Sequence, residues 1–133
     1  MKRVLTFGVY DLLHLGHIKL FEHAKMYGDE LIVAVQSGDY IKKYKPLSET
    51  YYSTEDRLYM VSSIKYVDRV IMYEDVDAAI CNIDFDVFVK GPDQIHQGFQ
   101  NAELWCLNNG KQVVTLPRTE DISSTLLKSS VLK

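Results

Sequence analysis

The chain has few cysteines and no long run of basic charge, and each absence argues against a class of protein. Its 133 residues include two cysteines, Cys81 and Cys106, whose spacing matches no metal-ligand motif. They are expected to be reduced, structural thiols in a cytoplasmic protein. No run of lysine or arginine exceeds two residues and the formal net charge is −3. Nucleic acid is therefore not expected as a partner.

Long apolar segments are also missing. The stretch MKRVLTFGVYD at the start is interrupted by Asp11 after a few residues, so we do not expect it to act as a signal-peptide core. Nothing approaches the length of a membrane-spanning helix, so no membrane is expected as a partner. The chain has no internal repeat, low-complexity tract or linker, and its length predicts one domain over residues 1–133.

Short runs rich in β-branched residues alternate with stretches of helical period, which is typical of βαβ units around a parallel sheet. Strands are expected at residues 3–8, 31–36, 68–72, 86–91 and 112–117. The expected fold class is α/β, a three-layer, Rossmann-like single domain with a five-stranded parallel sheet. Ligands of such sheets bind beyond the carboxyl ends of the strands, where the strand order reverses.

The stretches between these strands carry helix signals. Helices are expected up to Gly28, from a Ser53–Asp56 cap to about Tyr66, over 74–83, in a segment ending at Asn109, and from Ser123 onward. Residues 37–52 are polar and tyrosine-rich and are expected to form a loop, with at most one helical turn. A loop this long in a small protein is usually functional.

The stretch GVYDLLHLGHIKL joins the first strand to the first helix and carries Asp11, His14 and His17. Backbone N–H groups and the helix dipole favour an anion at such a turn, and Gly16 would let a phosphate approach closely. The histidines, at positions i and i+3, should point to one side of the first helical turn. Two alternatives are a zinc site made by these three residues, and a capping histidine beside a core histidine. Two histidines around a glycine after a strand favour the phosphate interpretation.

The stretch FGVYDLLHLGHIKL resembles the HxGH signature of the nucleotidyltransferase superfamily, in particular its cytidylyltransferase branch. The resemblance continues through KYVDRVI, DVFVKGPD and LPRTEDISST, in the order that the family has them. It implies transfer of CMP from CTP to a small phosphorylated alcohol, such as glycerol 3-phosphate or a related polyol, sugar or amino-alcohol phosphate, with release of pyrophosphate. Mg²⁺ would enter with the triphosphate rather than be held by protein alone, and the relatives are commonly homodimers.

The resemblance also implies roles for individual residues. His14 and His17 would donate hydrogen bonds to the nucleotide phosphates as charge builds up. Asp11 would orient a histidine, a backbone amide or Mg²⁺, or else simply cap the helix entry. Arg57 would pair with the phosphates or the acceptor, with a surface ion pair to Glu55 as the alternative.

Basic and hydroxyl residues elsewhere complete the expected site. Of the loop lysines Lys42, Lys43 and Lys45, the last two are favoured as phosphate ligands, and Arg118 with Thr119 would fix the nucleotide. The full set of expected catalytic residues is His14, His17, Lys43, Arg57 and Arg118. The expected nucleotide-binding residues are Phe7, Gly8, Val9, Tyr10, Asp11, Gly16, Lys45, Gly91, Asp93, Thr119, Ile122, Ser123, Ser124 and Thr125.

The sequence departs from the family pattern at three places. Asp121 stands where the family usually has glycine, Val9 replaces a small hydroxyl residue, and GPDQ (91–94) lacks the family's second acid and tryptophan. Asp121 and the altered GPDQ segment keep open a nucleotide-binding regulator with little turnover. An adenylyltransferase of the same superfamily is a second alternative, because the sequence does not place the backbone and loop contacts that choose the base.

Overall fold

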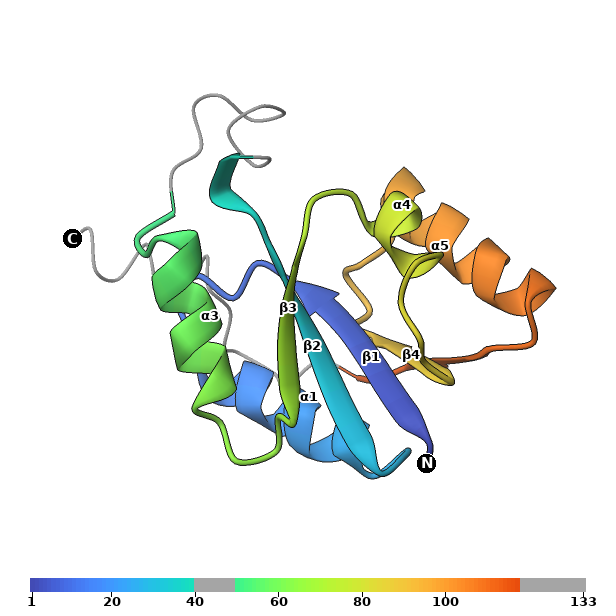
Figure 1. Cartoon of the computed structure of the whole chain (residues 1–133), viewed down its shortest axis with the longest axis horizontal. Coiled ribbons are helices and arrows are strands. Elements are labelled where there is room, and N and C mark those ends of the chain that lie inside the picture. The colour runs from blue at the N-terminus through green and yellow to red at the C-terminus, as the bar shows by residue number, and fades with distance from the viewer. Residues whose placement is uncertain (40–49, 118–133) are drawn as a thin grey trace.

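The computed structural model describes residues 1–39 and 50–117, and within them five parallel strands form one sheet in the order β3-β2-β1-β4-β5 (Figure 1). In chain order the elements are β1 (Arg3–Gly8), α1 (Leu15–Lys25), β2 (Glu30–Gln36), α3 (Thr54–Ser62), β3 (Arg69–Tyr73), α4 (Val76–Ile80), β4 (Val87–Lys90), α5 (Gln97–Asn108) and β5 (Gln112–Thr115). The predicted α/β class and the five-stranded parallel sheet are confirmed. The strand order reverses between β1 and β4, which places the expected binding region at their carboxyl ends.

Helices cover both faces of the sheet, which makes three layers. One core joins Leu5, Phe7 and Phe88 to buried residues of α4 and α5. The other joins Val4 and its neighbours in the sheet to buried residues of α1 and α3. Residues 31–35 of β2 have no exposed surface, because a central strand of a parallel sheet is buried on both faces.

The central strand β1 pairs differently with its two neighbours. Its pairing with β2 runs from Arg3 opposite Glu30 to Gly8 opposite Val35. Its pairing with β4 consists of two residue pairs, Val4 with Val87 and Leu5 with Phe88. The two strands on either side of the order reversal therefore stop pairing before they end.

Three helices are shorter than the sequence predicts, and the first of them, α1, ends at Lys25 before reaching Gly28. Helix α3 ends at Ser62 instead of Tyr66, and the hydroxyls of Ser62 and Ser63 both donate to the carbonyl oxygen of Tyr59 in its last turn. Helix α4 covers 76–80 instead of 74–83, and the Asn82 side-chain amide donates to the carbonyl oxygen of Ala78 just after it. The start of α3 is as predicted, because Oγ of Ser53 accepts a hydrogen bond from the backbone N–H of Asp56.

Some expectations concern residues outside the described ranges. These are most of the loop after β2, the closing helix from Ser123 and the outer limits of the domain over residues 1–133. Across the described part of the chain, no helix has the length and apolar character to cross a membrane. Cys81 is exposed and Cys106 is buried, and both are free thiols.

Candidate active site

The turn after β1 is shaped by the close packing of Tyr10 against Gly8. Tyr10 has a backbone φ of 55° and is 5% exposed. A Cβ atom on Gly8 would lie 2.5 Å from Cζ of the Tyr10 ring, so only glycine fits at the end of β1. The left-handed backbone of Tyr10 costs about 1 to 2 kcal/mol, and such strain is typical of constrained functional turns.

His14 and His17 form a reciprocal cap at the start of α1. Nδ1 of His14 accepts a hydrogen bond from the backbone N–H of Gly16 at 3.0 Å, and Nδ1 of His17 accepts one from the backbone N–H of His14 at 3.3 Å. The two rings are stacked, with centroids 3.9 Å apart. The prediction that both histidines lie on one side of the first turn is confirmed. The capping role that the sequence favoured less is also present, so the same side chains order the helix start.

The hydrogen bonds of the histidine pair determine which nitrogen carries the proton. Because each Nδ1 accepts a backbone hydrogen bond, the proton of each neutral ring must be on Nε2. Burial and the neighbouring His14 lower the pKa of His17 to about 4. His17 is therefore neutral at physiological pH and offers an Nε2–H donor. The edge of the Tyr10 ring packs against His17, with centroids 5.4 Å apart, and contributes to this burial.

Asp11 anchors the segment that leads into α3. Its side chain is 2% exposed, and its two carboxylate oxygens accept hydrogen bonds from the backbone N–H groups of Tyr51 and Tyr52 at 2.9 and 3.1 Å. The residue that caps α1 is His14, so the alternative of Asp11 as the helix cap is wrong. Its role as an anchor for backbone amides is confirmed.

Arg57 joins the ends of two strands to the start of α3. The residue has no exposed surface, and its Nη1 donates to the carbonyl oxygens of Val9 at 2.9 Å and Gln36 at 2.8 Å. Its Nε donates to the carbonyl oxygen of Tyr52 and its Nη2 to Oγ1 of Thr54. Burial lowers the pKa of Arg57, and the nearby Asp11 partly offsets this. The alternative of a surface ion pair with Glu55 is wrong, since the guanidinium is buried among backbone carbonyls.

The donor set of this site does not favour a metal held by protein ligands. In residues 1–39 and 50–117, no three His, Cys, Asp or Glu side chains are grouped so as to hold a metal ion. The zinc alternative therefore has no geometric support among these residues.

The turn after β4 contacts the end of β1 through the side chain of Gln94. Its Oε1 accepts a hydrogen bond from the backbone N–H of Gly91 at 3.1 Å, and its Nε2 donates to the carbonyl oxygen of Phe7 at 2.7 Å. Sequence reasoning gave Gln94 no role. It also missed Lys90, which is 8% exposed and forms an ion pair with Glu103, with 3.2 Å between Nζ and Oε2. A polar residue three positions beyond a glycine at a strand end was the available signal for Gln94.

The other predicted site residues divide into placed and unplaced ones. The Phe7 side chain belongs to the core, and the residue contributes its carbonyl oxygen to this edge. Val9 is exposed and Asp93 lies exposed in the turn after β4. Outside the described residues lie Lys42, Lys43, Lys45, Arg118, Thr119, Asp121, Ile122, Ser123, Ser124 and Thr125.

The structure defines an α/β protein whose parallel sheet reverses its strand order between β1 and β4, with the histidine pair in the turn that follows β1. A model of the cytidylyltransferase-like family matches residues 5–130. The chain belongs to this cytidylyltransferase-like family.

Individual relatives agree with this assignment. The chain is 40% identical to a glycerol-3-phosphate cytidylyltransferase of Bacillus subtilis (strain 168), over 98% of both chains. It is 34% identical to an FAD synthase of Korarchaeum cryptofilum, over 99% of this chain and 92% of that protein. Among solved structures, a lipopolysaccharide core biosynthesis protein from Thermoplasma volcanium superposes with a TM-score of 0.75 at 28% identity, over 90% of this chain and 99% of that one.

Proposed function

We propose that the protein transfers CMP from CTP to a small phosphorylated alcohol and releases pyrophosphate, with glycerol 3-phosphate as the first acceptor to test. The observation that carries the proposal is the near-full-length similarity to a glycerol-3-phosphate cytidylyltransferase, joined to the neutral histidine pair at the start of α1. A phosphate oxygen of the acceptor attacks the α-phosphorus of CTP, and the bond from that phosphorus to the β-phosphate oxygen breaks. Because this nucleophile is already an anion, the protein needs no activated side chain.

The protein's task in this reaction is to position the reactants and to stabilise negative charge. The Nε2–H groups of His14 and His17 donate to oxygens of the α-phosphate and of the leaving pyrophosphate, where charge increases in the transition state. Their Nδ1 atoms are held by backbone N–H groups, so both donors are oriented before the nucleotide binds. Removing one such donor is expected to lower kcat by about 10² to 10³.

We propose that Arg57 has a different role from the other basic residues of the site. Lys43, Lys45 and Arg118, together with Thr119, Ile122 and the hydroxyls of Ser123, Ser124 and Thr125, bind the nucleotide and its phosphates. Arg57 instead acts through the backbone, because four acceptors already surround its guanidinium. It holds the turn after β1 in place against the segment that Asp11 anchors.

Mg²⁺ would accompany the triphosphate. With no group of three potential ligand side chains in residues 1–39 and 50–117, the ion would be held chiefly by phosphate oxygens and water, as Mg²⁺ commonly is. It would offset the charge of the phosphates and of the leaving pyrophosphate. We also propose that the protein works in the cytoplasm and forms a homodimer, the state that the family resemblance implies.

An adenylyltransferase activity is the second candidate, favoured by the similarity to an FAD synthase. The test incubates the protein with Mg²⁺, each nucleoside triphosphate in turn and a panel of phosphorylated acceptors, and measures pyrophosphate. The proposal expects CTP-dependent release that requires glycerol 3-phosphate or a related polyol, sugar or amino-alcohol phosphate. Selective use of ATP would establish the second candidate instead. Binding of CTP without turnover, with any acceptor of the panel, would contradict both and indicate a regulator.

A further inference from the structure

A side chain joins the ends of β1 and β4 at the point where a backbone hydrogen bond between the two strands is expected. We call such a hydrogen bond a rung of the sheet. The strands pair at Leu5 and Phe88, and extending this register by two residues would bring Phe7 opposite Lys90. In a parallel ladder the carbonyl oxygen of Phe7 would then accept a hydrogen bond from the backbone N–H of Gly91, the residue after Lys90. These are the two backbone groups that Gln94 contacts.

The Gln94 amide takes the place of that rung. The N–H of Gly91 donates to Oε1 of Gln94 at 3.1 Å, and Nε2 of Gln94 donates to the Phe7 carbonyl oxygen at 2.7 Å. Both backbone groups keep a partner, although the strands themselves are not directly bonded there. A primary amide suits this position because it presents one acceptor and one donor side by side, as a peptide group does.

The position of this inserted amide gives it a consequence for the site. It lies between the two strands where the strand order reverses, which is where ligands of such sheets bind. The turn carrying Tyr10, Asp11 and the histidine pair leaves the sheet directly after Phe7 and Gly8. The width between the strands at Phe7 therefore sets where this turn stands relative to the turn after β4.

We propose that Gln94 is a positioning residue whose side-chain amide is inserted as a rung between β1 and β4 and holds the two site turns at their working separation. This inference rests on the proposed function for its effect on activity. The inserted rung itself rests on the hydrogen bonds alone. Without the amide, the Phe7 and Gly91 groups either close the gap by bonding directly or lose their partners.

Gln94→Glu tests the donor half of the rung. At pH 8 the carboxylate still accepts from the Gly91 N–H, but it cannot donate to the Phe7 carbonyl oxygen. We expect kcat/KM to fall about tenfold relative to the wild-type protein at this pH, as for the loss of one hydrogen bond with a partner left unsatisfied. Partial burial beside the Phe7 carbonyl oxygen disfavours the ionised form, so the pKa of the new carboxyl group should lie above its ordinary value of about 4.3. At pH 5 the group is then largely protonated, has nearly the shape of glutamine and donates again, so the deficit should shrink to within about threefold.

Two further variants separate this effect from general damage. Gln94→Ala should be impaired to a similar degree at both pH values, because it has no group to protonate. Gln100→Ala, which removes an exposed amide that donates to the Ile95 carbonyl oxygen, should behave as the wild-type protein. Asp93, His96 and the Lys90–Glu103 pair lie near position 94 and are present in every variant, so each variant is compared with the wild-type protein at the same pH.

Thermal unfolding gives a readout that needs no substrate. The Tm deficit of Gln94→Glu should shrink from pH 8 to pH 5, and that of Gln94→Ala should not. If this recovery occurs and no triphosphate is consumed, the inserted rung stands and the proposed function fails. If CTP is consumed, the positioning role is overturned when Gln94→Glu matches the wild-type protein in kcat/KM at pH 8, or when its deficit in kcat/KM or Tm does not shrink at pH 5.

Discussion

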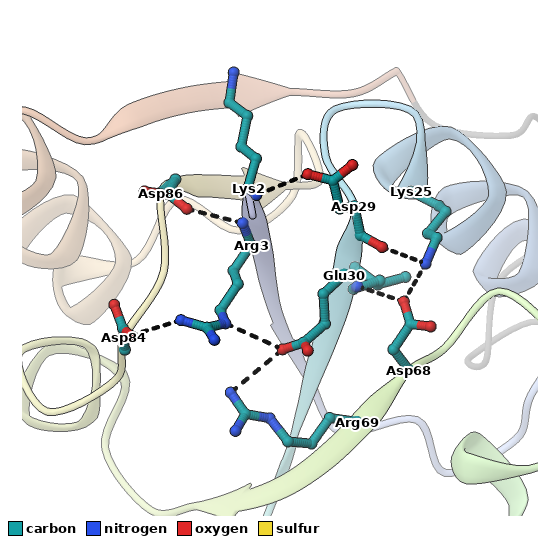
Figure 2. A network of polar contacts seen from close by, with 10 residues as sticks. Lys2, Arg3, Lys25, Asp29, Glu30, Asp68, Arg69, Asp84 and Asp86 are labelled. Atoms are coloured by element: carbon teal, nitrogen blue, oxygen red, sulfur yellow. Dashed lines mark hydrogen bonds and ion pairs between the residues drawn. The ribbon is translucent and has the colours of Figure 1, made fainter.

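The two edges of the sheet hold their charged residues in opposite ways. At the amino edge, shown in Figure 2, Arg3 pairs with Glu30 and Asp84, and Arg69 also reaches Glu30. Asp84 and Arg69 are exposed, and Arg3 and Glu30 are half-buried. At the carboxyl edge, Arg57 is 0% exposed and is bonded mainly to backbone carbonyls. Exposed ion pairs contribute little to stability, whereas a buried charge that loses its partners is costly.

This contrast indicates that the two edges have different structural roles. The amino edge aligns the strand starts through ion pairs whose side chains are half-buried or exposed. The carboxyl edge uses the buried charges of Arg57 and Asp11 to hold loop backbone, and thereby orients the histidine turn. Substitutions at the two edges should therefore differ in size and in which property they change.

The largest effect is expected for Arg57→Ala. It leaves the carbonyl oxygens of Val9, Gln36 and Tyr52 without their donor. Each such loss in a poorly hydrated place costs about 1 to 3 kcal/mol, so the free energy of unfolding should fall by about 3 to 5 kcal/mol. Chemical denaturation measures this loss. The control Arg69→Ala at the amino edge, where the side chain is 51% exposed, should cost about 1 kcal/mol or less. Equal losses for the two variants would remove the distinction between the edges.

The pH dependence of stability should reveal His17. Its pKa is about 4 in the folded protein and about 6.5 when unfolded, so between these values the unfolded chain binds the extra proton. The free energy of unfolding therefore keeps its full value above about pH 6.5 with respect to His17. It falls by roughly 3 kcal/mol in total as the pH is lowered toward 4. Denaturant titrations of wild-type protein and His17→Asn across this range provide the measurement. A slope that is the same in both proteins would show that His17 is not buried as described.

Gly8→Ala is expected to have an intermediate effect. The new methyl group would meet the Tyr10 ring at 2.5 Å, so the ring must leave its place against His17. Overpacking of this kind costs about 1 to 3 kcal/mol, and the turnover assay should lose activity with it.

A matched glycine and a double variant complete that test. Gly91→Ala has open space around its added methyl and serves as the control for stability alone. In a protein that already carries Tyr10→Ala, the clash disappears. Gly8→Ala should then lower the free energy of unfolding much less than it does in the wild-type protein. If Gly8→Ala destabilises the Tyr10→Ala protein as much as the wild-type protein, the Tyr10 ring is not what excludes a side chain at Gly8.

The smallest effect is expected for Asp68→Asn at the amino edge. Burial alone would raise the pKa of Asp68, but hydrogen bonds from Lys25 and from the Leu31 N–H lower it below its ordinary value. Its stabilisation is therefore present above about pH 4 and is lost at lower pH, and at pH 7 the variant should lose about 1 kcal/mol or less. Turnover at pH 7 should be unchanged, and a large loss of activity would contradict the division between the edges.

The parts of the fold that depend on local pattern could be predicted from the sequence. β1 and β2 were placed almost to the residue, because their apolar runs are continuous and bounded by glycine or polar residues. The shared side of His14 and His17 followed from their spacing on a helix. The predicted helix ends were less accurate, because the helical period of the sequence continues past Ser62, where α3 ends.

The features that depend on distant segments meeting could not be predicted. The sequence STEDR suggests a polar surface helix, and the burial of Arg57 arises because the ends of β1 and β2 converge on it. Likewise, the insertion of Gln94 depends on the register between β1 and β4, which no local pattern encodes.

The most direct test of the account is nitrogen-15 NMR of the two imidazoles at pH 7, recorded before and after adding CTP with Mg²⁺. The account predicts that both rings are neutral with the proton on Nε2, and that the Nε2 signals of His14 and His17 shift when the nucleotide binds. Rings protonated on Nδ1, or Nε2 signals that saturating CTP leaves unchanged, would contradict it.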